Sequence, residues 1–276
     1  MRLATAIPLF LLVALYTSGW LRLARRHGAA VVWRKPALAL VGVLALVAAL
    51  ASPLDELAHE VFVAHMVQHL LLVSVAAPAI LLADPLAAAL WGLPPPLRRG
   101  GGWLLAPRSP ARRVFATLIW APVAWLVHAT VLWLWHVPQI YDAAVEHRVI
   151  HDAEHLALFG SALLYWWPVI AAAPRVRTPP SPPALIAYLV LGAFQASSLG
   201  LWLMTRSAPL YGAHAVTSLA WGLNPLEDQA WGGVIMWTAS AVVDMGAVLA
   251  VLFRFFTSES NHRARFLDAL PPVRDN

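Results

Sequence analysis

Hydrophobic residues dominate this chain in long continuous runs, and short polar segments separate the runs. Seven runs are apolar and long enough to suggest helices across a hydrocarbon core about 30 Å thick, which takes about 20 helical residues. They cover residues 3–21, 36–52, 61–82, 114–135, 149–171, 184–204 and 231–256. The runs do not alternate at every second position, so they predict helices and not strands. We expect an all-α polytopic membrane bundle with a seven-span domain over residues 1–256 and a short cytoplasmic tail over 257–276.

Composition supports a membrane protein. The chain is 60% hydrophobic and 12% charged, whereas soluble domains are about 45–50% apolar and about 25% charged. It contains no cysteine, which excludes disulfides, thiolate metal sites and iron–sulfur clusters.

The basic residues predict the orientation of the bundle. Sixteen of the 19 lysines and arginines lie in the loops after the first, third and fifth runs and near the C-terminus. Cytoplasmic loops are enriched in these residues, so we expect the N-terminus outside and the C-terminus inside. The basic excess is then a topology signal, and we expect a multi-pass protein of the bacterial inner (plasma) membrane without a nucleic-acid partner.

On this map, most histidines lie in the outer half of the membrane or in the outer loops. These are His59, His65, His69, His128, His136, His147, His151, His155 and His214. Nine of the 14 acidic residues fall on the same side. The outward side is therefore where we expect the chemistry.

Two of the predicted helices carry histidines four residues apart. His65 and His69 form one pair, and His147, His151 and His155 form a ladder at the start of the fifth run. Residues four apart lie on the same helix face one turn apart. Two facing pairs would place four imidazoles in one layer, as in the metal or haem sites of helix bundles.

The neighbouring residues suggest how such a site would be completed. His136, just before Pro138, is a further candidate ligand, and Asp152 and Glu154 are candidates for hydrogen bonds that fix imidazole tautomers. The ligand type suits copper or zinc, with haem as an alternative. The segment "HDAEH" also fits the His-x-x-Glu-His metalloprotease pattern. Nothing in the sequence indicates a cleft for a peptide, and we do not expect an enzyme.

Three long motifs resemble the CtaG-type cytochrome c oxidase assembly factor family. They are "FVAHMVQHLLLVSVAAPAILLADP", "LWHVPQIYDAAVEHRVIHDAEHLALFGSALLYWWPVI" and "LEDQAWGGVIMW", and the resemblance extends from about residue 50 to residue 250. The positions that match the histidine motifs of this family are His65, His69, His136, His147, His151 and His155, with Asp228 and Gln229 in the last motif.

The resemblance implies a role in assembling a haem–copper oxidase, by binding copper and handing it to an oxidase subunit. An extracytoplasmic copper donor and a homodimer are further expectations. Two alternatives stay open from the residues alone: a haem-binding electron carrier with two histidine ligands, and a copper transporter. A transporter needs a polar route through the membrane, for which Asp244 is the acidic residue at depth.

Overall fold

The computed structural model describes residues 3–27, 33–104 and 106–268, which contain helices but no strand. The α-helices are α1 (Leu3–His27), α2 (Arg34–Leu50), α3 (Pro53–Leu57), α4 (Phe62–Leu70), α5 (Ala77–Leu82), α6 (Pro85–Gly92), α7 (Pro95–Leu104), α8 (Pro110–Leu118), α9 (Ala121–Trp135), α10 (Pro138–Glu146), α11 (Arg148–Ile170), α12 (Pro182–Met204), α13 (Gly212–Ala220) and α14 (Pro225–Asp268), and the π-helix η1 (Leu71–Ala76) joins α4 to α5. The all-α prediction is confirmed for this part of the chain.

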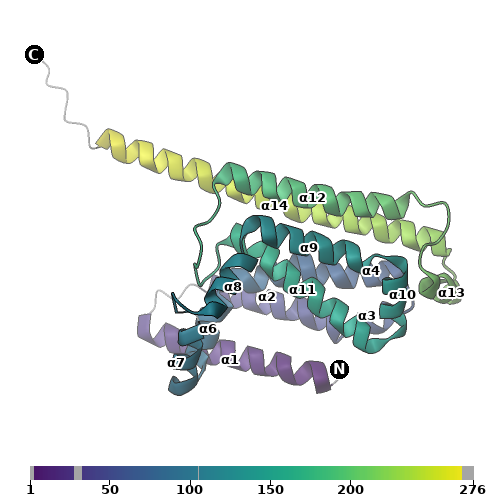
Figure 1. The fold of residues 1–276 in the computed structure, drawn as a ribbon, viewed down its shortest axis with the longest axis horizontal. Coiled ribbons are helices and arrows are strands. Elements are labelled where there is room, and N and C mark those ends of the chain that lie inside the picture. Colours follow the sequence, from purple (N-terminus) through teal and green to yellow (C-terminus); the bar gives the residue numbers. More distant parts are fainter. Residues whose placement is uncertain (1–2, 28–32, 105, 269–276) are drawn as a thin grey trace, which may run out of the picture.

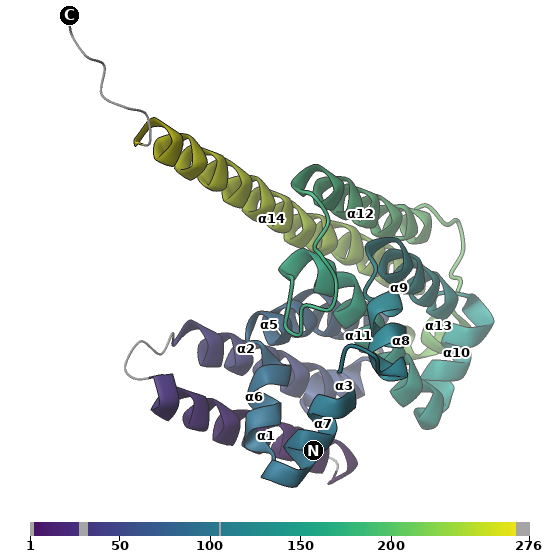
Figure 2. The same ribbon diagram turned by 60° about the vertical axis from the view of Figure 1, so that its left-hand side comes forward.

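The long helices pack as neighbours around α4 and α11. Helices α12 and α14 lie side by side, and α14 also packs against α4. Helix α11 packs against α9 and α5, while α1 lies against α6 at the opposite side of the bundle (Figures 1 and 2). The helices that carry the candidate ligands thus each pack against several others.

Among the described residues, three helical segments are long and apolar enough to cross a membrane: Phe62–Leu82, Pro182–Met204 and Pro225–Thr257. They match the predicted spans 61–82, 184–204 and 231–256. The predicted spans at 3–21, 36–52 and 149–171 coincide with α1, α2 and α11, but α2 has only 17 residues, and α11 buries polar side chains that lower its mean hydropathy. The total of seven spans, the orientation of the termini and the boundary at residue 256 stay predictions.

The predicted span 114–135 is not one straight helix. It consists of α8 and α9, which meet at an angle of 69° and qualify as a fourth span only when taken together. The cause is Pro122 in the first turn of α9. Proline has no N–H to donate, and its ring collides with the carbonyl of the residue four positions earlier, so a helix kinks or breaks at that point.

The π-helix η1 lies directly after His69 within the segment Phe62–Leu82. Proline again explains the departure from α-helical geometry, because Pro78 would clash with the carbonyl of Ser74 in an unbroken α-helix. The wider turn also leaves the carbonyl of Val73 available to accept a hydrogen bond from the indole of Trp166 at 3.1 Å. Short π-helical segments are frequent near functional sites.

Helices α12 and α14 approach each other closely at two glycines. A Cβ added to Gly233 would lie 2.6 Å from the carbonyl oxygen of Gly200, and one added to Gly200 would lie 2.7 Å from that of Gly233. Small residues at such positions let membrane helices pack backbone to backbone.

We therefore expect Gly233→Ala to push α12 and α14 apart and to lower the free energy of unfolding by about 1–3 kcal/mol. Gly246→Ala is the matched control on the same helix, because a Cβ there meets no heavy atom of the described residues within 4 Å beyond its own stretch of helix backbone. The control should be neutral or stabilising by up to about 1 kcal/mol, since alanine favours helix more than glycine does. Thermal unfolding of the two variants in detergent tests this. Equal melting temperatures would contradict the close packing.

Candidate metal centre

Helices α4 and α11 bring the two histidine pairs together. His65 and His69 are buried on one face of α4, with ring centroids 4.3 Å apart. His151 and His155 are buried on α11, with ring centroids 4.1 Å apart. Across the two helices, 5.2 Å separates the rings of His65 and His151, and 5.6 Å separates those of His69 and His155. The four imidazoles form the single layer that their spacing predicts.

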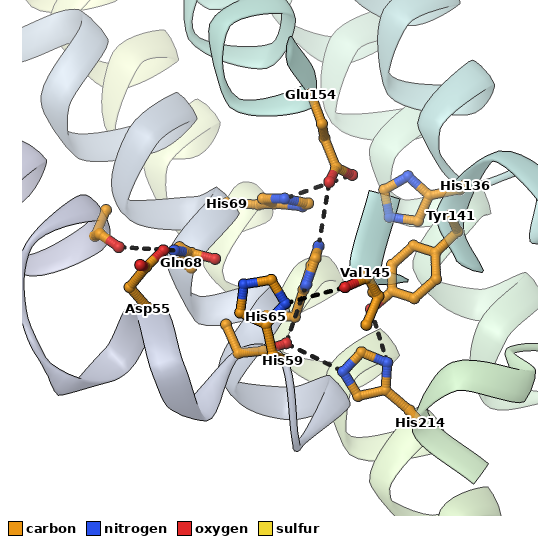
Figure 3. Close-up of polar contacts among 12 residues, drawn as sticks. Asp55, His59, His65, Gln68, His69, His136, Tyr141, Val145, Glu154 and His214 are labelled. Carbon is orange, nitrogen blue, oxygen red and sulfur yellow. Dashed lines mark hydrogen bonds and ion pairs between the residues drawn. The ribbon is translucent and has the colours of Figure 1, made fainter. Parts of the chain in front are cut away.

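The carboxylate of Glu154 faces the two imidazoles of α4 (Figure 3). Its two carboxylate oxygens are each 3.6 Å from a ring nitrogen, Oε2 from Nε2 of His65 and Oε1 from Nε2 of His69. These distances are too long for hydrogen bonds. Two ligand atoms on one tetrahedral ion, with bonds of about 2.0–2.2 Å, are about 3.3–3.6 Å apart. The observed spacing therefore fits ligands that share one cation.

Backbone carbonyls set the tautomers of two imidazoles. The Nδ1–H of His65 donates to the carbonyl of Ala58 at 3.2 Å, and the Nδ1–H of His136 donates to the carbonyl of Leu132 at 2.7 Å. A carbonyl can only accept, so the proton is on Nδ1 and the lone pair is on Nε2. Both Nε2 atoms are buried and have no hydrogen-bond partner among the described residues. A lone pair oriented in this way is what a metal ion binds.

The donor set of imidazole nitrogen and carboxylate oxygen fits a transition metal. The oxygens of Glu154 are buried and accept no hydrogen bond from any described residue. A buried carboxylate without a partner is costly, and a cation held at Glu154 would offset that cost. Copper, zinc, iron and nickel all accept this donor set, so it does not select one metal.

The carboxylate of Asp228, in the first turn of α14, holds the start of α4. It accepts hydrogen bonds from the N–H groups of Phe62 at 2.8 Å and Val63 at 3.0 Å, and from the hydroxyl of Ser218 at 2.6 Å. The residue before α4, Val61, provides no side-chain cap. A carboxylate at a helix N-terminus satisfies free N–H groups and favours the helix dipole. Asp228 therefore positions the helix that carries His65.

Gln229, the next residue, also bonds to the backbone. Its Oε1 accepts from the N–H of Leu210 at 2.7 Å, and its Nε2 donates to the carbonyl of Leu203 at 3.1 Å. The first interaction ties the loop after α12 to α14, and the second ties the last turn of α12 to α14. Like Asp228, Gln229 thus supports the bundle around the site and does not contact the imidazoles through these bonds.

The structure adds a buried hydrogen-bonded pair that the sequence did not assign to the site. Nε2–H of His214 donates at 3.1 Å to the carbonyl of Ala58 that also accepts from His65, and the hydroxyl of Tyr141 lies 3.4 Å from Nδ1 of His214. Burial and the neighbouring His65 lower the pKa of His214 to about 4, and burial raises the pKa of Tyr141 well above its usual value. Both groups are therefore neutral at pH 7. No periodicity links residues 141 and 214 to residue 65, so only their contacts could reveal them.

Two predicted residues lie apart from the imidazole layer. His147 is exposed at the N-terminal end of α11. The side chain of Asp152 is 65% exposed and lies 3.8 Å from the guanidinium of Arg148, so the tautomer-fixing role expected for it is not supported. Glu154 does reach the imidazoles, and at His65 it approaches the lone-pair side and not the N–H side. Asp152 and Glu154 differ in this respect because each residue along α11 points about 100° away from the one before it. Asp152 therefore faces outward, while Glu154 faces the imidazoles.

The fold and this site define a helical membrane protein with a buried histidine–carboxylate cluster. The model of the cytochrome c oxidase caa3 assembly factor family, Caa3_CtaG, matches residues 14–258. The chain belongs to this family, as its motifs predict, and its role is therefore in cytochrome c oxidase assembly. Comparisons with curated proteins and with solved structures found no match.

We expect Asp228→Asn to destabilise the start of α4 by about 1–2 kcal/mol, because it removes a charged acceptor from a helix N-terminus. Glu227→Gln is the matched control: Glu227 lies in the same turn of α14 but is exposed. Amide hydrogen exchange at Phe62 and Val63 provides the measurement. Protection should fall in the first variant only, and unchanged protection there would contradict the capping role.

Proposed function

We propose that this protein binds copper as cargo in the cluster around Glu154 and passes it to a subunit of the oxidase that it helps to assemble. The observation that carries the proposal is the approach of one buried carboxylate to Nε2 of His65 and of His69, at 3.6 Å each. We further propose that the cluster lies in the outer leaflet of the bacterial inner membrane, as the distribution of arginines predicts. Copper would then arrive from an extracytoplasmic donor.

The ligand set suits a carrier that must release its cargo. It lacks thiolates, which bind copper(I) more tightly than imidazole and carboxylate do. The carbonyl of Ala58 already holds His65 in the tautomer with a free Nε2, so this ligand can bind and release a metal without a change of tautomer. A metal bound by neutral imidazoles can leave by stepwise ligand exchange.

The packing argues against the haem alternative. The rings of His65 and His69, and those of His69 and His155, meet edge to face at 78° and 86°. A haem with two axial histidines needs a wide flat slot between its ligands, and rings in mutual contact leave none. The copper-carrier proposal requires no such slot.

Transport across the membrane has less support than holding and transfer. A cavity of about 50 Å³ lies beside His69 and is lined also by His128 and Asp244. This volume accommodates only a few water molecules. We therefore propose lateral transfer to the client and not flux through the bundle.

Replacing Glu154 by Gln or His69 by Ala should lower copper affinity by about 10–100-fold, because each change removes a ligand or its charge. The control is His147→Ala, an exposed histidine of the same motif. Copper bound after equilibrium dialysis, measured by elemental analysis, gives the affinity of each variant. In cells that depend on the protein, copper content of the purified oxidase should fall in parallel. Wild-type copper binding in both cluster variants would rule out this site.

A further inference from the structure

A second group of metal-binding side chains lies next to the cluster around Glu154. Asp55, His59 and His151 each offer one ligand atom, and these atoms lie within 4.8 Å of one another. In the cluster around Glu154, the ligand atoms of His65, His151 and Glu154 likewise lie within 4.8 Å of one another. His151 is common to the two groups, so they are adjacent and connected by one side chain.

His59 is oriented as a ligand in this second group. Its Nδ1–H donates to the carbonyl of Val145 at 3.2 Å, which leaves the lone pair on Nε2. Nε2 is buried and has no hydrogen-bond partner among the described residues. The ring of His59 lies 4.5 Å from that of His151, centroid to centroid. His59 thus has the carbonyl-fixed tautomer of His65 and a place against the shared ligand.

The exposure of the side chains falls stepwise from the surface of the protein to Glu154. Side-chain exposure is 65% at Asp152, 32% at Arg148, 11% at Asp55 and zero at Glu154. The group of Asp55, His59 and His151 therefore lies between the surface and the buried carboxylate. A cation that moves inward along this gradient meets it first.

Arg148 balances the negative charge of the group formed by Asp55, His59 and His151. Its Nη2 pairs with Asp55 at 3.0 Å, while its Nε is 3.8 Å from the exposed carboxylate of Asp152. The guanidinium can thus shift toward Asp152 when a metal ion takes its place at Asp55. Asp55 therefore has a positive partner both before and after the ion binds.

We propose that Asp55, His59 and His151 form a loading site through which copper reaches the cluster at Glu154. A neutral imidazole has one lone pair, so His151 serves one site at a time and remains a ligand while the others exchange: Asp55 and His59 leave as His65 and Glu154 bind. The ion keeps its charge and oxidation state throughout. This inference rests on the proposed function, since it assigns the route by which the cargo arrives.

The test separates rates from affinity. Copper(II) is mixed with the metal-free full-length protein in detergent, binding is followed by quenching of tryptophan fluorescence, and release is followed by transfer to a chelator. A site on the route lowers the barrier in both directions and leaves the end state unchanged. His59→Ala should therefore slow binding and release by about tenfold each, with Kd unchanged. His69→Ala should raise Kd, and the exposed His147→Ala should change neither.

Three outcomes overturn the loading site, and they differ from failure of the proposed function. If His59→Ala leaves both rates at the wild-type value, copper does not pass through His59. If His59→Ala raises Kd as much as His69→Ala does, the two residues belong to one site. If His147→Ala slows binding as much as His59→Ala does, the effect is not specific to the group. A wild-type protein that binds no copper would instead refute the carrier function, and the loading site with it.

Discussion

The burial of one carboxylate among imidazoles is the interaction on which the rest of this structure depends. Removing an ionised carboxylate from water costs several kcal/mol unless a cation or hydrogen bonds compensate. Glu154 accepts no hydrogen bond from a described residue and lies equally far from Nε2 of His65 and of His69. Such an arrangement is poor for stability alone, since apolar side chains would fill the same space at lower cost. The two distances of 3.6 Å from the carboxylate to the imidazole nitrogens are instead those expected of ligands around a cation.

The surrounding backbone explains how the bundle keeps this arrangement. Asp228 of α14 caps the start of α4, and Asp142 of α10 caps the start of α13 through the N–H groups of Gly212 and Ala213 at 3.1 and 3.2 Å. Two helices that carry buried histidines, α4 and α13, are therefore each fixed at their start by a carboxylate from another element. The carbonyl of Ala58 accepts from both His65 and His214, which links the tautomers of two imidazoles.

The family match and the geometry of the cluster are consistent with each other, but they bear on different questions. The family match covers residues 14–258, which include both groups of metal-binding side chains. Family membership establishes the role in oxidase assembly, while the chemistry of the cluster suggests what is carried. Two adjacent groups that share His151 offer a physical reason why a carrier could load and unload an ion in a buried site: ligands exchange one by one, and the ion is never without them.

The sequence by itself determined what depends on local geometry. The apolar runs indicated helices, and four-residue spacing placed His65 with His69 and His151 with His155, because side-chain direction along a helix repeats every 3.6 residues. Only the tertiary structure decided how the helices are rotated against each other. That rotation turns Glu154 toward Nε2 of His65 and of His69, and it brings His59 and His214 into contact with the layer. Such contacts join residues as far apart as 58 and 214, and no periodicity along the chain encodes them.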